Sequence, residues 1–146
     1  MSLPSFDLVR PRSLGQAVEA LAAHGEGAMV LAGGTDLVPN LQAGVAAPRA
    51  LVDIKGIEEL RGFRFDRDGG LEIGALTTLT EIAESRDIQE RYAVLAQAAH
   101  TVASPVLRNM GTLGGNLCLD TRCLWYNQSH FWRQSCGFCL KKDGTV

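Results

Sequence analysis

The sequence predicts an α+β fold, with its helices and strands divided between two small subdomains. Two patterns support this prediction: a helix, a strand, a glycine turn and a second strand precede residue 57, and an alternating hairpin pattern follows residue 60. A chain of 146 residues that is 46% hydrophobic can bury the cores that such a fold needs. We therefore expect a first subdomain at residues 1–57, a second and incomplete one at 58–117, and a cysteine-rich segment at 118–146.

The first subdomain is predicted to be a small parallel unit. Residues 13–24 are expected to form a helix, because Ser13 and Gln16 have the spacing of a capping box and a glycine at position 25 ends the pattern. The apolar residues that share one face of this helix are Leu14, Ala17, Val18, Leu21 and Ala22. Residues 28–32 and 51–54 are interpreted as short buried strands with a short helix between them, an order typical of a parallel pair.

The second subdomain is predicted to begin with a hairpin. Residues 61–65 and 71–75 alternate between apolar and polar types on either side of an Asp-Arg-Asp-Gly-Gly turn. Thr78 and Glu81 have the spacing of a capping box, so a helix is expected to begin there. Residues 92–102 are interpreted as a further helix. Its predicted apolar face consists of Val94, Leu95, Ala98 and Val102.

Charge and leader patterns exclude several classes of protein. The formal net charge is −2, the sequence pI is about 5.9 and no basic run is present, so neither nucleic acid nor an anionic membrane is an expected partner. The first residues lack the basic and apolar regions of a signal peptide, and no apolar run approaches the length of a membrane span. The chain is therefore expected to be soluble and cytoplasmic.

Two glycine-rich segments are candidates for binding phosphate. Residues 31–37 read Leu-Ala-Gly-Gly-Thr-Asp-Leu, and residues 108–117 read Arg-Asn-Met-Gly-Thr-Leu-Gly-Gly-Asn-Leu. Adjacent glycines permit positive φ angles, and successive N–H groups in such turns form concave anion sites. Two facing turns would hold both phosphates of a dinucleotide, with hydroxyl groups from Thr35 and Thr112 as further donors. Taken singly, each segment is more typical of an ordinary tight turn, because neither is a G-x-G-x-x-G fingerprint and there is no Walker lysine.

All four cysteines lie near the end of the chain, at Cys118, Cys123, Cys136 and Cys139. A disulfide framework normally spreads its cysteines through a small secreted fold, so this clustering favours a metal or iron–sulfur site. The spacing alone allows the four together to bind either zinc or an iron–sulfur cluster, since thiolates suit both. The remaining interpretation is four reduced thiols without a metal. His130 lies among them, but no pattern marks it as a ligand.

Together, the two glycine segments resemble the FAD-binding segments of the molybdenum hydroxylase flavoproteins, a family that includes the medium subunits of carbon monoxide dehydrogenase and the FAD domain of xanthine dehydrogenase. The Ala-Gly-Gly-Thr-Asp-Leu and Arg-Asn-x-Gly-Thr-x-Gly-Gly-Asn patterns carry the resemblance, which covers nearly the whole chain. It implies an α+β fold of two subdomains with FAD between them. The FAD-binding residues that it implies are Ala32, Gly33, Gly34, Thr35, Asp36, Thr112, Gly114, Gly115 and Asn116, with Asp120 near the ribityl or flavin region.

The cysteine-rich segment resembles the insert of one branch of this family, the flavoprotein subunits of 4-hydroxybenzoyl-CoA reductase. The similar stretches are Arg122-Cys123 and residues 126–129, 131–133 and 137–139. In that branch the insert holds a [4Fe–4S] cluster, so the resemblance implies that Cys123 and Cys139 are its first two ligands. The other two ligands are then expected beyond Val146, and Cys118 and Cys136 are spare thiols. The chain is accordingly expected to be a fragment of a longer subunit.

The resemblance implies an FAD-binding electron-transfer subunit of an oxidoreductase that is active only in an assembled complex. In the 4-hydroxybenzoyl-CoA reductase branch, the ring hydroxyl is removed to give benzoyl-CoA at a molybdenum cofactor on a large partner subunit. A small partner subunit carries [2Fe–2S] clusters. Electrons from a donor such as ferredoxin would pass through the [4Fe–4S] cluster and FAD toward the molybdenum. Since the chain shows no nucleophile–base pair, no catalytic residue is assigned to it.

Two other functions remain open from the sequence. One is the FAD subunit of a different molybdenum hydroxylase, which oxidises carbon monoxide, an aldehyde or an N-heterocycle; the cysteine-rich segment argues against it. The other is an interaction domain that is stabilised by zinc and binds no flavin. Such a domain would not need the paired glycine segments.

Overall fold

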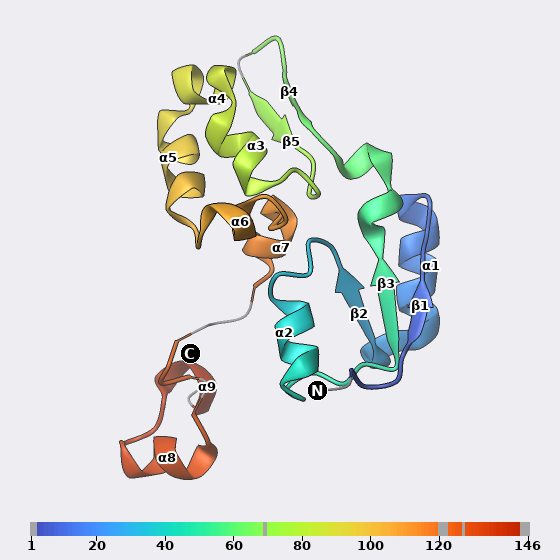
Figure 1. The fold of residues 1–146 in the computed structure, drawn as a ribbon, viewed down its shortest axis with the longest axis vertical. Helices are drawn as coiled ribbons and strands as arrows, with labels where there is room; N and C mark the ends of the chain where they lie inside the picture. Colours follow the sequence, from blue (N-terminus) through green and yellow to red (C-terminus); the bar gives the residue numbers. More distant parts are fainter. Residues whose placement is uncertain (1–2, 69, 120–122, 127, 144–146) are drawn as a thin grey trace.

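The computed structural model describes residues 3–68, 70–119, 123–126 and 128–143. The elements of the first half of the chain are β1 (Asp7–Val9), α1 (Leu14–His24), the 3₁₀ helix η1 (Gly25–Gly27), β2 (Ala28–Leu31), α2 (Leu37–Gln42), β3 (Ala50–Asp53), and the 3₁₀ helices η2 (Ile54–Gly56) and η3 (Glu58–Leu60). They form one three-stranded sheet with its helices. The elements that come later in the chain form a second group beside it (Figure 1). The described helices do not include one with the length and apolar character that a bilayer crossing needs.

The first sheet is parallel throughout, with the strand order β1-β3-β2. The predicted parallel pair of β2 and β3 is confirmed, and their register aligns Val30 with Val52. The third strand, β1, was not predicted, because three residues are too few to show an alternating pattern. The central strand β3 is buried over Ala50, Leu51 and Val52, as expected for a strand that has a neighbour on each side.

The second group begins with an antiparallel hairpin and continues with helices. Its elements are β4 (Phe63–Phe65), β5 (Leu71–Ile73), α3 (Leu79–Glu84), α4 (Arg86–Arg91), α5 (Ala93–Thr101), α6 (Pro105–Arg108) and α7 (Leu113–Leu117). The pairing of β4 with β5 confirms the predicted hairpin. The helices pack behind it around a core of buried apolar residues formed by Leu79, Ile82, Ala83, Ile88, Ala96 and Ala99.

Side-chain caps explain where two of the helices begin. Thr78 accepts a hydrogen bond from the N–H of Glu81, and the Glu81 carboxylate accepts from the N–H of Thr78, so the predicted capping box is present at α3. At α1, Ser13 caps the N–H of Gln16 as predicted, but the Gln16 side chain accepts from the N–H of Arg12 instead of Ser13. The predicted reciprocal box at α1 is therefore wrong in its second bond, which is displaced by one residue.

The buried faces of α1 and α5 differ from the predicted ones. On α1, Ala17 is buried, whereas Leu14 and Val18 are exposed. On α5, Ala96 and Ala99 are buried, whereas Val94 is 80% exposed. In each helix, small alanines pack against the neighbouring elements, and larger side chains at the edge of the predicted face are exposed. Tertiary packing decides which face of the helix is buried. Strand β2 was predicted to be buried, but Met29 and Val30 are exposed, because β2 lies at the edge of its sheet.

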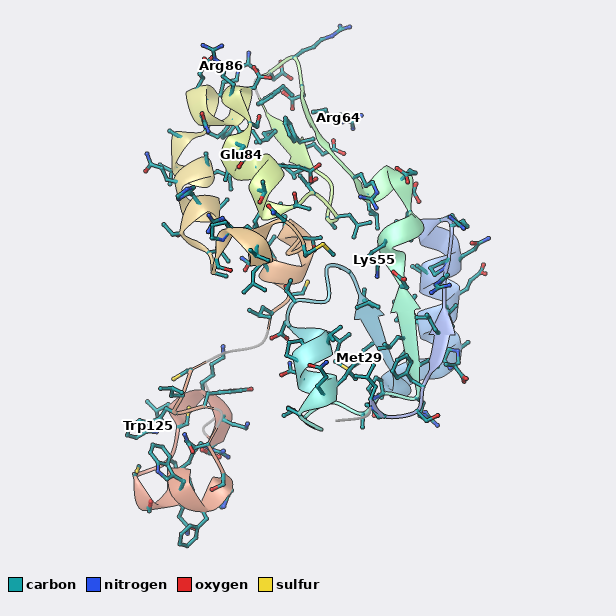
Figure 2. The ribbon with its side chains drawn as sticks, in the orientation of Figure 1. Met29, Lys55, Arg64, Glu84, Arg86 and Trp125 are labelled. Atoms are coloured by element: carbon teal, nitrogen blue, oxygen red, sulfur yellow. The ribbon has the colours of Figure 1, made fainter. Side chains whose placement is uncertain are left out.

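The cysteine-rich segment forms a small unit of its own. It contains α8 (His130–Ser135) and α9 (Leu140–Asp143), which lie apart from both sheets in Figure 1. Trp125 and Trp132 meet edge to face with their ring centroids 5.0 Å apart. Figure 2 shows Trp125 on this unit, well away from Met29 and Lys55 of the first sheet.

Candidate functional site

The first glycine loop, residues 33–36, connects the end of β2 to the start of α2. Gly34 has a φ angle of +76°, which explains why glycine is suited to this turn. The carbonyl of Gly34 accepts a hydrogen bond from Val38 at 3.0 Å, and the Asp36 carboxylate accepts one from the Asn40 side chain at 3.1 Å. These bonds tie the loop to the first turn of α2. Residues 32–36 are all half-buried.

The second glycine loop, residues 109–116, is fastened to the start of α3. The N–H of Leu79 donates to the carbonyl of Gly111 at 2.9 Å, and the N–H of Leu113 donates to the carbonyl of Thr77 at 2.8 Å. The buried side chain of Thr112 then caps α7 by accepting from the N–H of Gly115 at 3.2 Å. The second loop is therefore held rigidly by the second group of elements.

The two glycine loops touch each other. A β-carbon on Gly33 would overlap the backbone carbonyl of Met110, and a β-carbon on Gly111 would stand 3.6 Å from the Thr35 hydroxyl. In Figure 1 the loop between β2 and α2 correspondingly lies beside α7. The first loop belongs to the parallel sheet and the second to the hairpin and its helices. These contacts agree with the expectation that the two glycine segments, about 80 residues apart in the sequence, face each other.

The backbone amides of the two loops are not equally available to an anion. Among the described residues, none accepts a hydrogen bond from the N–H groups of Gly33, Gly34, Thr35 or Thr112. In the second loop, by contrast, the N–H of Gly114 donates to the carbonyl of Ala75 at 2.9 Å, and the N–H of Gly115 is used by the Thr112 cap. The free donors that can meet a phosphate therefore lie mainly in the first loop.

The remaining predicted FAD-binding residues, all in or after the second loop, differ in their burial. Gly114 is half-buried against Ala75, where a β-carbon would collide with the Ala75 backbone. Gly115 and Asn116 are exposed on α7. Asp120 lies outside the described residues.

Arg108 has a structural role that its sequence position did not reveal. Its guanidinium is buried and donates hydrogen bonds to the carbonyls of Val102 at 3.0 Å and Ala103 at 3.3 Å. Ala103 has a φ angle of +47°, so these bonds hold a turn in a backbone region that L-residues rarely adopt. The buried Arg108 side chain therefore stabilises the turn at residues 102 and 103.

The four cysteines are free thiols that do not form a preassembled metal site. Among the described residues, no three His, Cys, Asp or Glu side chains gather closely enough to bind a metal ion. Backbone hydrogen bonding at Tyr126 and at Trp125 lowers the pKa of the exposed Cys123 thiol. Cys139 is partly buried, while Cys118, Cys123 and Cys136 are exposed.

A buried ion pair organises the cysteine-rich segment, and no sequence pattern predicted it. Arg133 donates from Nε to Asp143 Oδ2 at 2.6 Å and from a terminal nitrogen to Oδ1 at 2.8 Å. Its other terminal nitrogen donates to the carbonyl of Gln128. The hydrogen bonds to Arg133 lower the pKa of Asp143 to about 2, and the same contacts raise the pKa of Arg133. The partners are ten residues apart, beyond the spacings that helix geometry makes recognisable.

Comparisons with known proteins identify the family. Residues 4–123 match the family described as "FAD binding domain in molybdopterin dehydrogenase". The carbon monoxide dehydrogenase medium chain of Hydrogenophaga pseudoflava is 40% identical over 114 residues, which are 78% of this chain and 39% of that protein. The xanthine dehydrogenase FAD-binding subunit of Escherichia coli O157:H7 is 39% identical over 109 residues, or 75% of this chain and 37% of that protein.

Solved structures agree with this result. The structure of carbon monoxide dehydrogenase from Hydrogenophaga pseudoflava superimposes with a TM-score of 0.75 at 40% identity, covering 80% of this chain and 40% of that one. Quinoline 2-oxidoreductase from Pseudomonas putida 86 gives a TM-score of 0.74 at 31% identity with the same coverage. The chain thus spans about two fifths of the length of the relatives that it matches.

The α+β fold is that of an FAD-binding domain. The chain belongs to the family of FAD-binding domains found in molybdopterin dehydrogenases. The predicted fold class and the predicted molybdenum hydroxylase flavoprotein family are therefore confirmed, whereas the 4-hydroxybenzoyl-CoA reductase branch stays a prediction. The family match contains both glycine loops and ends at Cys123, so most of the cysteine-rich segment lies outside it.

Proposed function

We propose that this chain is the FAD-binding part of an electron-transfer subunit in a molybdenum hydroxylase complex, within the 4-hydroxybenzoyl-CoA reductase branch. The observation that carries the assignment to this branch is the cysteine-rich segment, residues 118–146, most of which lies beyond the end of the family match at residue 123. On this proposal, residues 1–57 and 58–117 form the two FAD-binding subdomains, and residues 118–146 form the cluster-binding insert.

The FAD diphosphate would be bound mainly by the first glycine loop. The amides of Gly33, Gly34 and Thr35 donate no hydrogen bond to a described residue and are therefore the candidate donors to an anion, and the Thr112 amide lies in the loop that touches them. Since the amides of Gly114 and Gly115 are already used, we assign these glycines the role of allowing close approach. The full set of proposed FAD-binding residues is Ala32, Gly33, Gly34, Thr35, Asp36, Thr112, Gly114, Gly115, Asn116 and Asp120. When bound, FAD would supply the electron-transfer chemistry, and the protein would position it.

Cys123 and Cys139 are the proposed ligands of a [4Fe–4S] cluster, with the remaining two expected beyond residue 146. Iron–sulfur clusters are bound by thiolates whose sulfurs commonly accept hydrogen bonds. Backbone hydrogen bonding at Tyr126 and Trp125 lowers the pKa of the Cys123 thiol, which favours the thiolate that such a cluster needs. Cys118 and Cys136 are not assigned.

The partners are proposed from the same branch of the family. They are a large subunit with the molybdenum cofactor, a small subunit with [2Fe–2S] clusters, and an electron donor such as ferredoxin, all in the cytoplasm. The reaction would be reductive dehydroxylation to benzoyl-CoA on the large subunit. The chain itself would bind, orient and tune its cofactors.

A second candidate is the FAD subunit of another molybdenum hydroxylase. The names of the relatives favour it, since they include carbon monoxide, xanthine and nicotinate dehydrogenases. On this candidate the cysteine-rich segment would carry no cluster.

The experiment that decides is purification of the complete subunit without oxygen, followed by assays of flavin, iron and zinc. The proposal predicts bound FAD and about four irons per chain, the content of one [4Fe–4S] cluster. Cys123→Ala and Cys139→Ala should lose the iron and keep the FAD, whereas Cys136→Ala, the matched control, should keep both. FAD without iron would support the second candidate. Zinc without flavin would contradict both and leave a zinc-stabilised interaction domain.

A further inference from the structure

The side chains of Arg133 and Asp143 are largely buried, although they lie in a small and mostly exposed unit in which the Asp143 residue as a whole is exposed. The two side chains are 7% and 12% exposed, in contrast to 77% and 71% for the pair of Arg64 and Glu72 on the hairpin, in which two nitrogens of Arg64 donate to one oxygen of Glu72. All the described donors and acceptors of the buried pair have partners, which is the condition under which a buried ion pair is tolerated.

Apolar packing contributes little to holding this unit together. The most exposed of its large aliphatic and aromatic side chains are Leu124, Phe131 and Leu140, at 83%, 80% and 79%. Its described ring pairs are the edge contact of the two tryptophans and the tilted contact of His130 with Phe138. The guanidinium of Arg133, by contrast, joins α8 to α9 and to the backbone at Gln128. The ion pair is therefore one of the links that close the unit, beside the contact of Lys142 with the Tyr126 ring at 4.4 Å.

The ion pair is hydrogen-bonded directly to the backbone of Cys139. Asp143 Oδ2 accepts from Arg133 Nε and also from the backbone N–H of Cys139 at 3.0 Å. The N–H of Phe138 donates to the carbonyl of Arg133 at 2.6 Å. Asp143 thus binds the backbone of Cys139, and Arg133 binds the backbone of Phe138.

The turn that leads into Cys139 needs such support. Gly137 has a φ angle of +86° and Phe138 one of +66°. A bulky residue in the left-handed region is energetically unfavourable and persists only where the surrounding contacts compensate for it. Without the ion pair we expect this turn to relax and the Cys139 sulfur to lose its fixed position.

We propose that Arg133 and Asp143 are positioning residues for the metal-binding thiolate of Cys139. The inference rests on the function proposed above and extends it, because it assigns the ordering of a cluster ligand to a buried ion pair that itself touches no metal. Partners of this kind typically change metal affinity by about 10- to 100-fold when they are replaced.

The test uses the complete subunit, purified without oxygen, in two variants and one control. Asp143→Asn keeps the shape of the side chain and removes its charge. Arg133→Lys keeps the charge and removes the planar fork that makes two bonds. Arg64→Lys, the matched control, makes the same change in the exposed pair of the hairpin, and Figure 2 shows Arg64 far from Trp125 and the cysteine unit. Each protein is assayed for FAD, for iron, for the rate of iron release to a chelator and for the electron paramagnetic resonance of the reduced cluster.

We expect Asp143→Asn and Arg133→Lys to retain FAD, to release iron at least about tenfold faster and to show an altered resonance spectrum. Arg64→Lys should match the wild type in all four assays. Wild-type release rates and spectra in both cysteine-unit variants would overturn the positioning role while the proposed function stands. Loss of FAD together with iron would overturn it too, because the pair would then support the whole subunit. Absence of iron from the wild type would refute the cluster itself, and with it this inference.

Discussion

The backbone carbonyl of Met110 occupies the place where a side chain on Gly33 would begin. This contact joins the two glycine loops backbone to backbone, although one belongs to the parallel sheet and the other to the hairpin and its helices. Glycine is required at position 33 because the backbone of Met110 leaves no room for a β-carbon. A positive φ angle is not the reason, since it occurs at Gly34 instead. The contact therefore sets how closely the two candidate FAD-binding loops approach.

Gly33→Ala should separate the loops. Both colliding groups are fixed, since Met110 offers main chain and not a flexible side chain, so we expect a loss of stability of about 1–3 kcal/mol, the usual range for overpacking. We also expect less FAD per chain. Chemical denaturation and a flavin assay on the complete subunit measure the two effects.

Gly15→Ala is the matched control for that experiment. Gly15 lies in the first turn of α1, and the nearest heavy atom to an added β-carbon is the Ser13 hydroxyl at 4.0 Å. Alanine should therefore be neutral or stabilise the protein by up to about 1 kcal/mol. If Gly33→Ala behaved like Gly15→Ala in both assays, the close contact of the two loops would be contradicted.

Features that depend on neighbouring residues were predictable from the sequence. The Thr78 capping box, the hairpin and the parallel pair of β2 and β3 all follow from local spacing, and all three are confirmed. The two glycine loops could be selected in the same way, because adjacent glycines next to threonine are visible in the sequence. Their roles in FAD binding remain predictions.

Features that depend on distant residues were not predictable. Helical spacing gave α5 an apolar face that includes Val94, but packing against α3 and α4 selects Ala96 and Ala99. Similarly, residues 28–32 are apolar throughout, and only the strand order shows that Met29 lies on an exposed edge. The pairing of Arg133 with Asp143 spans ten residues and leaves no periodic signal.

Ile88→Ala should be strongly destabilising, and Val94→Ala should not. Ile88 is fully buried among α3, α4 and α5, so its truncation leaves a cavity and should cost about 2–5 kcal/mol. Val94 is exposed on the neighbouring helix, so its truncation should change stability by less than about 0.5 kcal/mol. Denaturant titrations followed by circular dichroism compare the two. Equal losses would show that the sequence-based face of α5 was the right one.

Thr78→Ala should remove the start of α3. The Thr78 hydroxyl accepts from the N–H of Glu81, and replacing such a cap by alanine costs typically about 1 kcal/mol. Because the same residue bridges to Thr112, amide hydrogen exchange should also accelerate at the second glycine loop. Thr101→Ala is the control, since its exposed hydroxyl donates only to the carbonyl of Ala98 within α5. The prediction fails if exchange near Thr112 is as slow in Thr78→Ala as in Thr101→Ala.

Acid should open the cysteine-rich segment in a defined pH window. The pKa of Asp143 is about 2 in the folded chain and 3.8 as the ordinary value, because Arg133 stabilises the carboxylate. A carboxyl group whose pKa is lowered by folding stabilises the fold above its unfolded pKa, and that stabilisation is lost as the pH falls toward its folded pKa. The segment should therefore be intact above about pH 4 and should open progressively between about pH 4 and pH 2.

Tryptophan fluorescence reports this transition selectively, because the only two tryptophans of the chain, Trp125 and Trp132, both lie in the segment. We expect their emission to change between about pH 4 and pH 2 in the wild type. In Asp143→Asn the ionisable group is absent, so the emission should already differ at neutral pH and should lack that step. A wild-type step that persists unchanged in Asp143→Asn would show that other carboxyl groups hold the segment, and that the ion pair with Arg133 does not.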